Sequence, residues 1–182
     1  MLKLEFIADD ILFVPQFIDS NAGADLRINL KNYSCAIEDD IDALLRIYGI
    51  AYFSGQLDRK YIFNHLSTII SPGETKRVPI GFKVNLNSIF RDENLIPYLQ
   101  IVSRSGLASK GLIVANAPGI VDVGYLYEVK VLLHNQSNIP HVLVHGDRVA
   151  QCMVQFSERF NAKFVENFDA PNRNGGFGST GV

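Results

Sequence analysis

Short stretches in which apolar and polar residues alternate recur along this chain, with turn residues between them. The alternation is clearest over residues 2–6, 78–86, 129–132 and 141–144. An apolar side chain at every second position is typical of a strand with one buried face. Because no helical crossovers separate these stretches, we expect an all-β fold, a sandwich or jelly-roll barrel, rather than an α/β sheet.

Proline and glycine signal turns between these strands at residues 72–74, 118–119 and 145–147. The chain has 182 residues, 47% of them hydrophobic, and contains no long uninterrupted apolar run. That length and composition predict one soluble globular domain with a sizeable core and no membrane segment. The first residues lack the order of a secretory signal, so we expect the protein in the cytoplasm, or in a host's cytoplasm if a phage encodes it.

Charge and cysteine content narrow the functional classes. A net charge of −2 offers no general attraction to a nucleic-acid backbone, so we do not expect a nucleic-acid partner. Cys35 and Cys152 are too few for a disulfide framework, and we expect them to be small apolar side chains rather than nucleophiles. His141 and His145 would lie about 13 Å apart in a strand, too far to share one metal ion. No transition-metal site is therefore predicted.

One segment has the periodicity of a helix. Acidic residues at 38–40 precede four apolar residues spaced i, i+3, i+4 and i+7, and Gly49 follows them. The four apolar residues are Ile41, Leu44, Leu45 and Tyr48. Acidic residues in a first turn suit the helix dipole, and glycine suits a helix end. We therefore expect a short helix with one apolar face.

The last segment, residues 171–182, is rich in glycine. Four of the final eight residues are glycine, Phe177 lies among them, and Arg173 precedes them. Backbone N–H groups of glycines can cradle phosphates, an arginine can pair with them, and a phenyl ring can stack on a base. Composition alone leaves two interpretations open: a flap that closes over a nucleotide, or a disordered tail.

Five segments resemble, in order, the five motifs of trimeric dUTP pyrophosphatases (dUTPases). They are AGADL (22–26), SRSGLASKG (103–111), NAPGIVDVGY (116–125), GDRVAQ (146–151) and RNGGFGSTG (173–181). One such match would be weak, whereas five in the right order are specific. The resemblance implies a jelly roll that hydrolyses dUTP to dUMP and pyrophosphate, which limits uracil incorporation into DNA and supplies dUMP.

The resemblance also implies roles for individual residues. Asp122 matches the aspartate that activates the water attacking the α-phosphate. Tyr125 matches a tyrosine under the deoxyribose that leaves no room for a 2′-hydroxyl, and Asn116 matches an amide that recognises uracil. Asp25 and Arg148 match residues that lie behind the site and order their neighbours. From the residue pattern alone, Asp122 could also be a solvated turn aspartate, and Tyr125 a core tyrosine.

The remaining matches imply contacts with the substrate, either from side chains or from glycine backbone groups. These residues are Arg104, Ser105, Gly106, Gly119, Gln151, Arg173, Gly176, Phe177, Gly178, Ser179 and Thr180. The family further implies a homotrimer whose active sites combine segments of different subunits. Mg²⁺ should be held mainly by triphosphate oxygens and water, because this ion prefers them to an all-protein cage.

Between the first and second motifs, the chain is longer than the family pattern. We place an insertion at about residues 32–70, within a barrel domain of residues 1–170, and a smaller expansion at residues 87–96. The predicted helix lies in the larger insertion. A surface insertion costs little loop-closure entropy, so it can serve as a lid or packing element, or as the site of a protein partner.

Two alternative functions remain. The dCTP deaminases, including bifunctional ones, share the fold, but Leu132 occupies the position of their catalytic glutamate, which leaves no obvious proton carrier. The other alternative is a dUTPase scaffold with an added regulatory role through a protein partner. Leu126 and Tyr127 also depart from the family, which more often has Arg-Gly there, and the details of the interface are therefore open.

Overall fold

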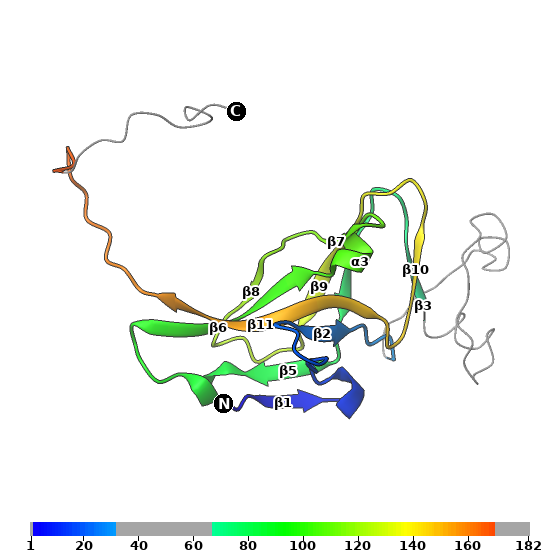
Figure 1. Ribbon diagram of the computed structural model, residues 1–182, viewed down its shortest axis with the longest axis horizontal. Helices are drawn as coiled ribbons and strands as arrows, with labels where there is room; N and C mark the ends of the chain where they lie inside the picture. The colour runs from blue at the N-terminus through cyan, green and yellow to red at the C-terminus, as the bar shows by residue number, and fades with distance from the viewer. Residues whose placement is uncertain (1, 32–66, 170–182) are drawn as a thin grey trace.

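The computed structural model describes residues 2–31 and 67–169. Its strands, in chain order, are β1 (Glu5–Ala8), β2 (Ala24–Arg27), β3 (Ser67–Ile70), β4 (Thr75–Pro79), β5 (Phe82–Asn85), β6 (Leu95–Ser103), β7 (Leu112–Val114), β8 (Gly119–Val121), β9 (Lys130–Asn135), β10 (His141–Val144) and β11 (Arg148–Glu158). The helical elements among them are short: η1 (Ile11–Phe13), η2 (Leu86–Ile89) and α3 (Ser105–Ala108). The predicted all-β class is confirmed (Figure 1).

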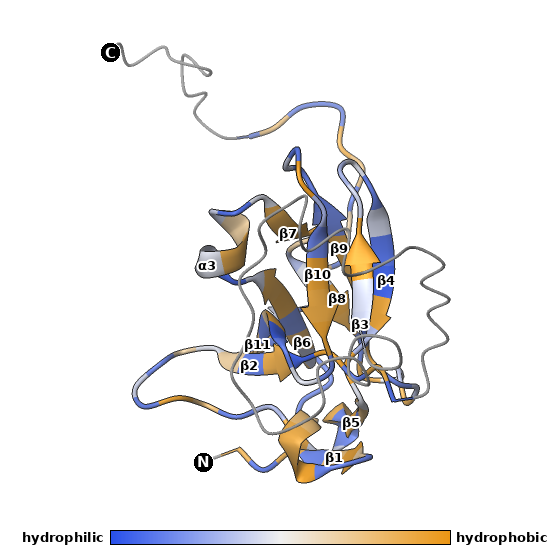
Figure 2. Ribbon diagram, turned by 90° about the vertical axis from the view of Figure 1, so that its right-hand side faces the viewer, coloured by the Kyte–Doolittle hydropathy of each residue, from blue (hydrophilic) through white to orange (hydrophobic). Residues whose placement is uncertain are grey.

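The described strands form four small antiparallel sheets. Their orders are β2-β11-β6-β8, β4-β9-β7, β1-β5 and β10-β3. Alternate side chains of these strands point inward and form one core, to which Leu26, Val78, Leu99 and Leu133 contribute fully or almost fully buried side chains. Figure 2 shows the resulting change between hydrophobic and hydrophilic residues along the strands. The sheets therefore enclose one hydrophobic interior, as a jelly-roll barrel requires.

The predicted strand over residues 78–86 divides into β4 and β5 at Gly81. Gly81 has a φ of +79°, and a side chain there would place its Cβ 2.7 Å from the Asn29 side chain and 2.9 Å from Phe13. Glycine alone relieves both constraints, because it tolerates positive φ and has no Cβ. The chain changes sheets at this corner, and alternation alone did not indicate it.

The boundary of the predicted insertion is corrected by β3. This strand pairs with β10 in the register Ile70↔His141 to Ser67↔Val144. Ser67, Thr68 and Ile70 are buried. The last four residues of the interval predicted as an insertion therefore belong to the barrel. The helix predicted near Ile41 lies outside the described residues.

The chain leaves the barrel after β11. Residues 159–169 lie away from the sheets (Figure 1). Phe160, Phe164 and Phe168 are 87–90% exposed there. Three large apolar side chains in this position are unusual for a segment without a partner.

Candidate functional site

β2, the first part of β11 and the end of β6 bring four polar residues of the resemblance together. Asp25 lies opposite Gln151 in the β2–β11 pair, and β11 also pairs with β6, which ends directly before Arg104. The Asp25 side chain is only 8% exposed. Its Oδ1 accepts a hydrogen bond from Arg104 Nε at 3.0 Å, and its Oδ2 accepts one from Arg148 Nη1 at 3.1 Å.

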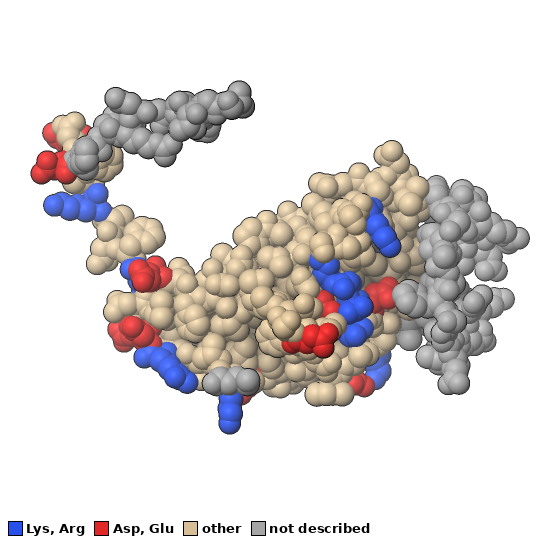
Figure 3. All heavy atoms as spheres, viewed as in Figure 1, with Lys and Arg blue, Asp and Glu red and all other residues tan. Residues whose placement is uncertain are grey.

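Further contacts connect the same residues. Gln151 Nε2 donates to Asp25 Oδ1 at 3.4 Å, and Arg104 Nη1 donates to the Arg148 carbonyl at 2.9 Å. We call Asp25, Arg104, Arg148 and Gln151 the phosphate-side cluster. In Figure 3, Lys and Arg side chains lie beside Asp and Glu side chains over the region where β2, β11 and α3 meet in Figure 1. A buried carboxylate thus holds two guanidinium groups at a partly open surface, an arrangement that suits a polyanion.

Two loops lie at the same end of β6. Ser105 and Gly106 begin α3 and are exposed, with Arg104 as the N-cap residue. The loop between β7 and β8 carries Asn116, whose Nδ2 would lie 3.3 Å from a Cβ at Gly119. The Ser103 hydroxyl accepts a hydrogen bond from Val114 N–H at 2.8 Å and connects the start of this loop to β6.

Asp122 lies toward the opposite end of β6. It directly follows β8, whose last residue, Val121, pairs with Leu99 of β6. Arg104 is five residues farther along the chain than Leu99, and a strand rises about 3.3 Å per residue, so the backbone of Arg104 lies about 16 Å along β6 from the residue opposite the end of β8. Asp122 is exposed. The structure therefore separates the predicted base from the phosphate-side cluster of the same chain.

Residues 122–128, which we call the Asp122 loop, carry two tyrosines. The Tyr125 N–H donates to the Asp122 carbonyl at 3.0 Å, and its hydroxyl donates to the Glu128 carbonyl at 3.0 Å. Tyr125 is 39% exposed, so it is not a core tyrosine. Its ring meets the ring of Tyr127 edge to face. The sequence indicated Tyr127 only as a departure from the family, not as a neighbour of Tyr125.

Six of the predicted substrate contacts lie outside the described residues: Arg173, Gly176, Phe177, Gly178, Ser179 and Thr180. Cys152 is buried, and burial raises the pKa of its thiol to about 12. A thiol with this pKa stays protonated near neutral pH, so Cys152 is unsuited to act as a nucleophile. Cys35 also lies outside the described residues.

The two histidines considered for a metal have separate partners. His141 Nε2 lies 3.0 Å from the Lys110 carbonyl, whereas His145 Nδ1 accepts a hydrogen bond from Leu30 N–H at 3.0 Å. Across residues 2–31 and 67–169, no group of three or more His, Cys, Asp or Glu side chains could hold a metal ion. The described part of the chain also has no helix long and apolar enough to cross a membrane.

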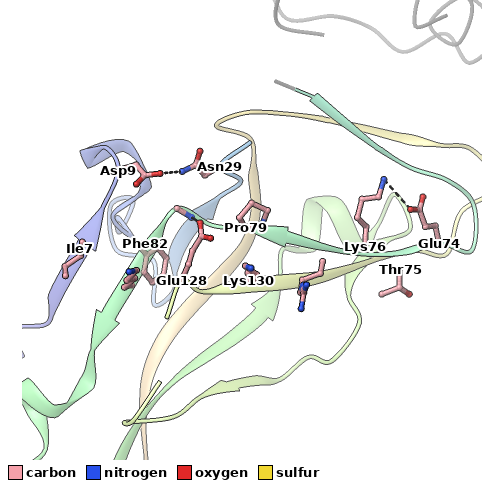
Figure 4. Close-up of a pocket in the computed structure, with 13 residues that line it drawn as sticks. Ile7, Asp9, Asn29, Glu74, Thr75, Lys76, Pro79, Phe82, Glu128 and Lys130 are labelled. Atoms are coloured by element: carbon pink, nitrogen blue, oxygen red, sulfur yellow. Dashed lines mark hydrogen bonds and ion pairs between the residues drawn. The ribbon is translucent and has the colours of Figure 1, made fainter. Parts of the chain in front are cut away.

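A cavity of about 650 Å³ lies between β4, β5 and β9, apart from the phosphate-side cluster, and Glu128 of the Asp122 loop forms part of its wall (Figure 4). The carboxylates in its wall have partners there. Asp9 accepts from Asn29 at 2.8 Å, Glu128 accepts from Gly81 N–H at 3.2 Å, and Glu74 lies 3.3 Å from Lys76. None of the side chains of the phosphate-side cluster lines this cavity.

Comparisons with known proteins agree with the motif pattern. A family model described as dUTPase matches residues 64–181. The deoxyuridine 5′-triphosphate nucleotidohydrolase of Caulobacter vibrioides (strain NA1000 / CB15N) is 34% identical over 161 residues, which cover 87% of this chain and 97% of that protein. The enzyme of the same description from Rickettsia bellii (strain OSU 85-389) is 39% identical over 121 residues, covering 65% and 76%.

Solved structures show the same fold. A dUTPase of Staphylococcus bacteriophage 80alpha has a TM-score of 0.64 at 16% identity, with 100% of each chain covered. The EIAV dUTPase has a TM-score of 0.57 at 17% identity, covering 93% of this chain and 100% of the other. Motif order, fold and sequence identity lead to one conclusion: the chain belongs to the dUTPase family.

Proposed function

We propose that this dUTPase hydrolyses dUTP to dUMP and pyrophosphate at sites that each combine two chains. One chain supplies the phosphate-side cluster, and another supplies the Asp122 loop. The observation that carries this proposal is the β6–β8 register, which places the end of β8, directly before Asp122, about 16 Å along β6 from the backbone of Arg104. One α-phosphate cannot lie against both groups of a single chain, whereas a neighbouring chain can bring its own Asp122 to the cluster.

Arg104 and Gln151 bind phosphate oxygens, with Ser105 and Gly106 beside them at the start of α3. Asp25 holds the Arg104 guanidinium through Nε, and Nη1 of Arg104 donates to the Arg148 carbonyl. The remaining N–H groups of Arg104 can donate to the triphosphate. Orienting the guanidinium before the substrate arrives lowers the entropic cost of binding.

Asp122 is the general base. Its exposed carboxylate accepts a proton from a water molecule whose oxygen attacks the α-phosphorus. A new bond forms between that oxygen and phosphorus, and the bond from phosphorus to the bridging oxygen breaks. Pyrophosphate leaves with that oxygen, opposite the attacking water.

Substrate selection uses the Asp122 loop and the loop between β7 and β8. Tyr125 lies under the deoxyribose, and Asn116 with the backbone near Gly119 recognises the uracil edge. Cytosine presents a donor where uracil presents an acceptor, so the wrong base leaves polar groups of the β7–β8 loop unpaired. Such mismatches weaken binding by several kcal/mol, about 1–3 for each unpaired group.

A homotrimer is the assembly that supplies these shared sites. The segment after β11 supports it, because Phe160, Phe164 and Phe168 are nearly fully exposed in the single chain and would be buried on a neighbour. In this proposal the glycine-rich segment of residues 171–182 closes over the nucleotide. Arg173 reaches the γ-phosphate, and Phe177 stacks on uracil. Gly176, Gly178, Ser179 and Thr180 add contacts to the phosphates.

The dUTPase family typically uses Mg²⁺. The described residues suit an ion carried by the substrate, because both oxygens of the Asp25 carboxylate accept hydrogen bonds from arginines. Triphosphate oxygens and water would therefore supply most ligands. When bound, the ion offsets the negative charge that develops on the phosphates. Since its substrate belongs to the free nucleotide pool, we place the enzyme in the cytoplasm.

The test is pyrophosphate release from dUTP, dTTP, dCTP and UTP, measured side by side on the full chain with Mg²⁺. We expect a strong preference for dUTP. A preference for dCTP, or release of ammonia, would favour a deaminase instead. Leu132 argues against that outcome, because a leucine at this position of β9 offers no carboxylate to carry a proton.

A further inference from the structure

The Asp122 loop contains an exposed aromatic pair. The ring centroids of Tyr125 and Tyr127 lie 5.8 Å apart at an interplanar angle of 67°, an edge-to-face arrangement. Tyr127 is 75% exposed, so packing in the core does not explain its large ring. It stands where the resembled family more often has glycine.

The backbone around Tyr125 is anchored at both sides of the pair. The Tyr125 N–H donates to the Asp122 carbonyl at 3.0 Å. At the other side, the Glu128 carboxylate accepts from Gly81 N–H at 3.2 Å and connects the loop to the corner between β4 and β5. The position of the Tyr125 side chain is thereby set relative to the barrel.

These backbone anchors do not fix the orientation of the Tyr125 ring plane. The hydroxyl donates to the Glu128 carbonyl at 3.0 Å, but the hydroxyl oxygen lies on the axis about which the ring turns. Rotation about the Cβ–Cγ axis therefore leaves this hydrogen bond intact. The edge-to-face contact with Tyr127 is different, because its geometry depends on the angle between the two rings.

We propose that Tyr127 is a positioning residue that fixes the ring plane of Tyr125 and thereby sets the discrimination between deoxyribose and ribose. The proposal rests on the role proposed for Tyr125 in the active site. A ring held in one plane excludes a 2′-hydroxyl, whereas a ring free to rotate can make room for it. Only UTP carries the 2′-hydroxyl, so Tyr127 affects mainly the hydrolysis of UTP and has little effect on that of dUTP.

The experiment measures kcat/KM for dUTP and for UTP with the full chain. Tyr127→Ala should lower the ratio between the two substrates by about fivefold, a change of the size that one aromatic pair supports. Tyr127→Phe keeps the ring and should retain the wild-type ratio. Leu126→Ala is the matched control, because Leu126 is an exposed apolar neighbour in the same loop. The melting temperature and oligomeric state of Tyr127→Ala should equal those of the wild type.

A double variant tests whether Tyr127 acts through Tyr125. Adding Tyr127→Ala to Tyr125→Ala should change the ratio no further, because the ring to be oriented is already missing. An unchanged ratio in Tyr127→Ala, or an equal loss in Tyr127→Phe, would overturn the inference. If Tyr125→Ala itself leaves the ratio unchanged, the proposed role of Tyr125 fails, and the inference fails with it.

Discussion

The two parts of the proposed active site differ in how firmly a single chain holds their charged side chains. In the phosphate-side cluster, Asp25 is nearly buried, and its carboxylate accepts hydrogen bonds from Arg104 and Arg148. In the Asp122 loop, Asp122 is exposed, and within the described residues no hydrogen bond or ion pair engages its carboxylate. The first part is assembled before substrate binds. The second presents a carboxylate that is free to act at the phosphate-side cluster of a neighbouring chain.

This difference suggests that one part serves substrate binding and the other serves the chemical step. Binding a polyanion benefits from charged groups held in advance, because ordering them later would weaken affinity. A base, by contrast, must reach water and the α-phosphate, so a carboxylate without competing partners is an advantage. Variants in the phosphate-side cluster should therefore change mainly KM, and variants of Asp122 should change mainly kcat.

Asp122→Asn should produce the largest effect. Removing the base should lower kcat by about a hundredfold to ten-thousandfold, with little change in the affinity for a non-hydrolysable dUTP analogue. The melting temperature should stay near that of the wild type, because Asp122 is exposed. Glu93→Gln, another exposed carboxylate, is the control. Turnover close to the wild-type value would remove Asp122 from its proposed role.

Mixing two inactive chains should give the next largest effect. Chains with Asp122→Asn and chains with Arg104→Ala, co-expressed with different tags, should assemble some sites that have both intact parts. Random assembly predicts that about a quarter of the sites are intact, and therefore about a quarter of wild-type activity. Activity no higher than that of either variant alone would show that each site is built within one chain.

Asp25→Ala should have a smaller effect, confined to the phosphate-side cluster. Losing hydrogen bonds to two arginines should lower the free energy of unfolding by about 1–3 kcal/mol. The KM for dUTP should rise about tenfold, because the Arg104 guanidinium is no longer held. Asp92→Ala removes a carboxylate that accepts only in a surface turn, from Asn94 N–H, and serves as the control. A lower kcat at unchanged KM would contradict the division between the two parts.

The smallest effect concerns pH and the turn that leads into Arg148. Burial lowers the pKa of His145 below its ordinary value of 6.5, and Lys31 adds to this effect while Asp10 opposes it. The unfolded chain therefore takes up a proton more readily than the folded one, and stability falls as the pH drops below about 6.5. In the same turn, burial raises the pKa of Asp147, which has the opposite effect at lower pH.

Chemical denaturation between about pH 7 and pH 5.5 measures this effect. The wild type should lose more stability over this interval than His145→Gln, whose side chain does not titrate. His134→Gln is the control, since His134 lies on β9 with Thr75 as its partner. Equal losses in the wild type and His145→Gln would show that His145 contributes nothing to the pH dependence.

Several features could be predicted from the sequence because their signals are local. The alternation over residues 141–144 coincides with β10, and the glycine-containing turns at Gly73 and Gly146 have positive φ. The ordered motifs identified the family, which the comparisons confirmed. These features depend on residues that are close in the chain, so their pattern is readable without knowing which strands pair.

Features that depend on strand pairing could not be predicted in the same way. β3 was placed in the insertion because nothing in its four residues indicates a partner more than 70 positions away, yet it pairs with β10. The register between β6 and β8 places Asp122 far from Arg104, although both lie in neighbouring motifs. Only tertiary structure sets such distances, because they follow from which residues lie opposite one another.

The sequence by itself determined the fold class, the family and the residue types of the proposed site. The tertiary structure decided that Asp25 connects two arginines from motifs 79 and 123 positions away, and that Tyr127 meets Tyr125 edge to face. The reason is physical. A motif specifies which chemical groups are present, whereas hydrogen-bond geometry and ring orientation arise only when the barrel closes and brings distant segments together.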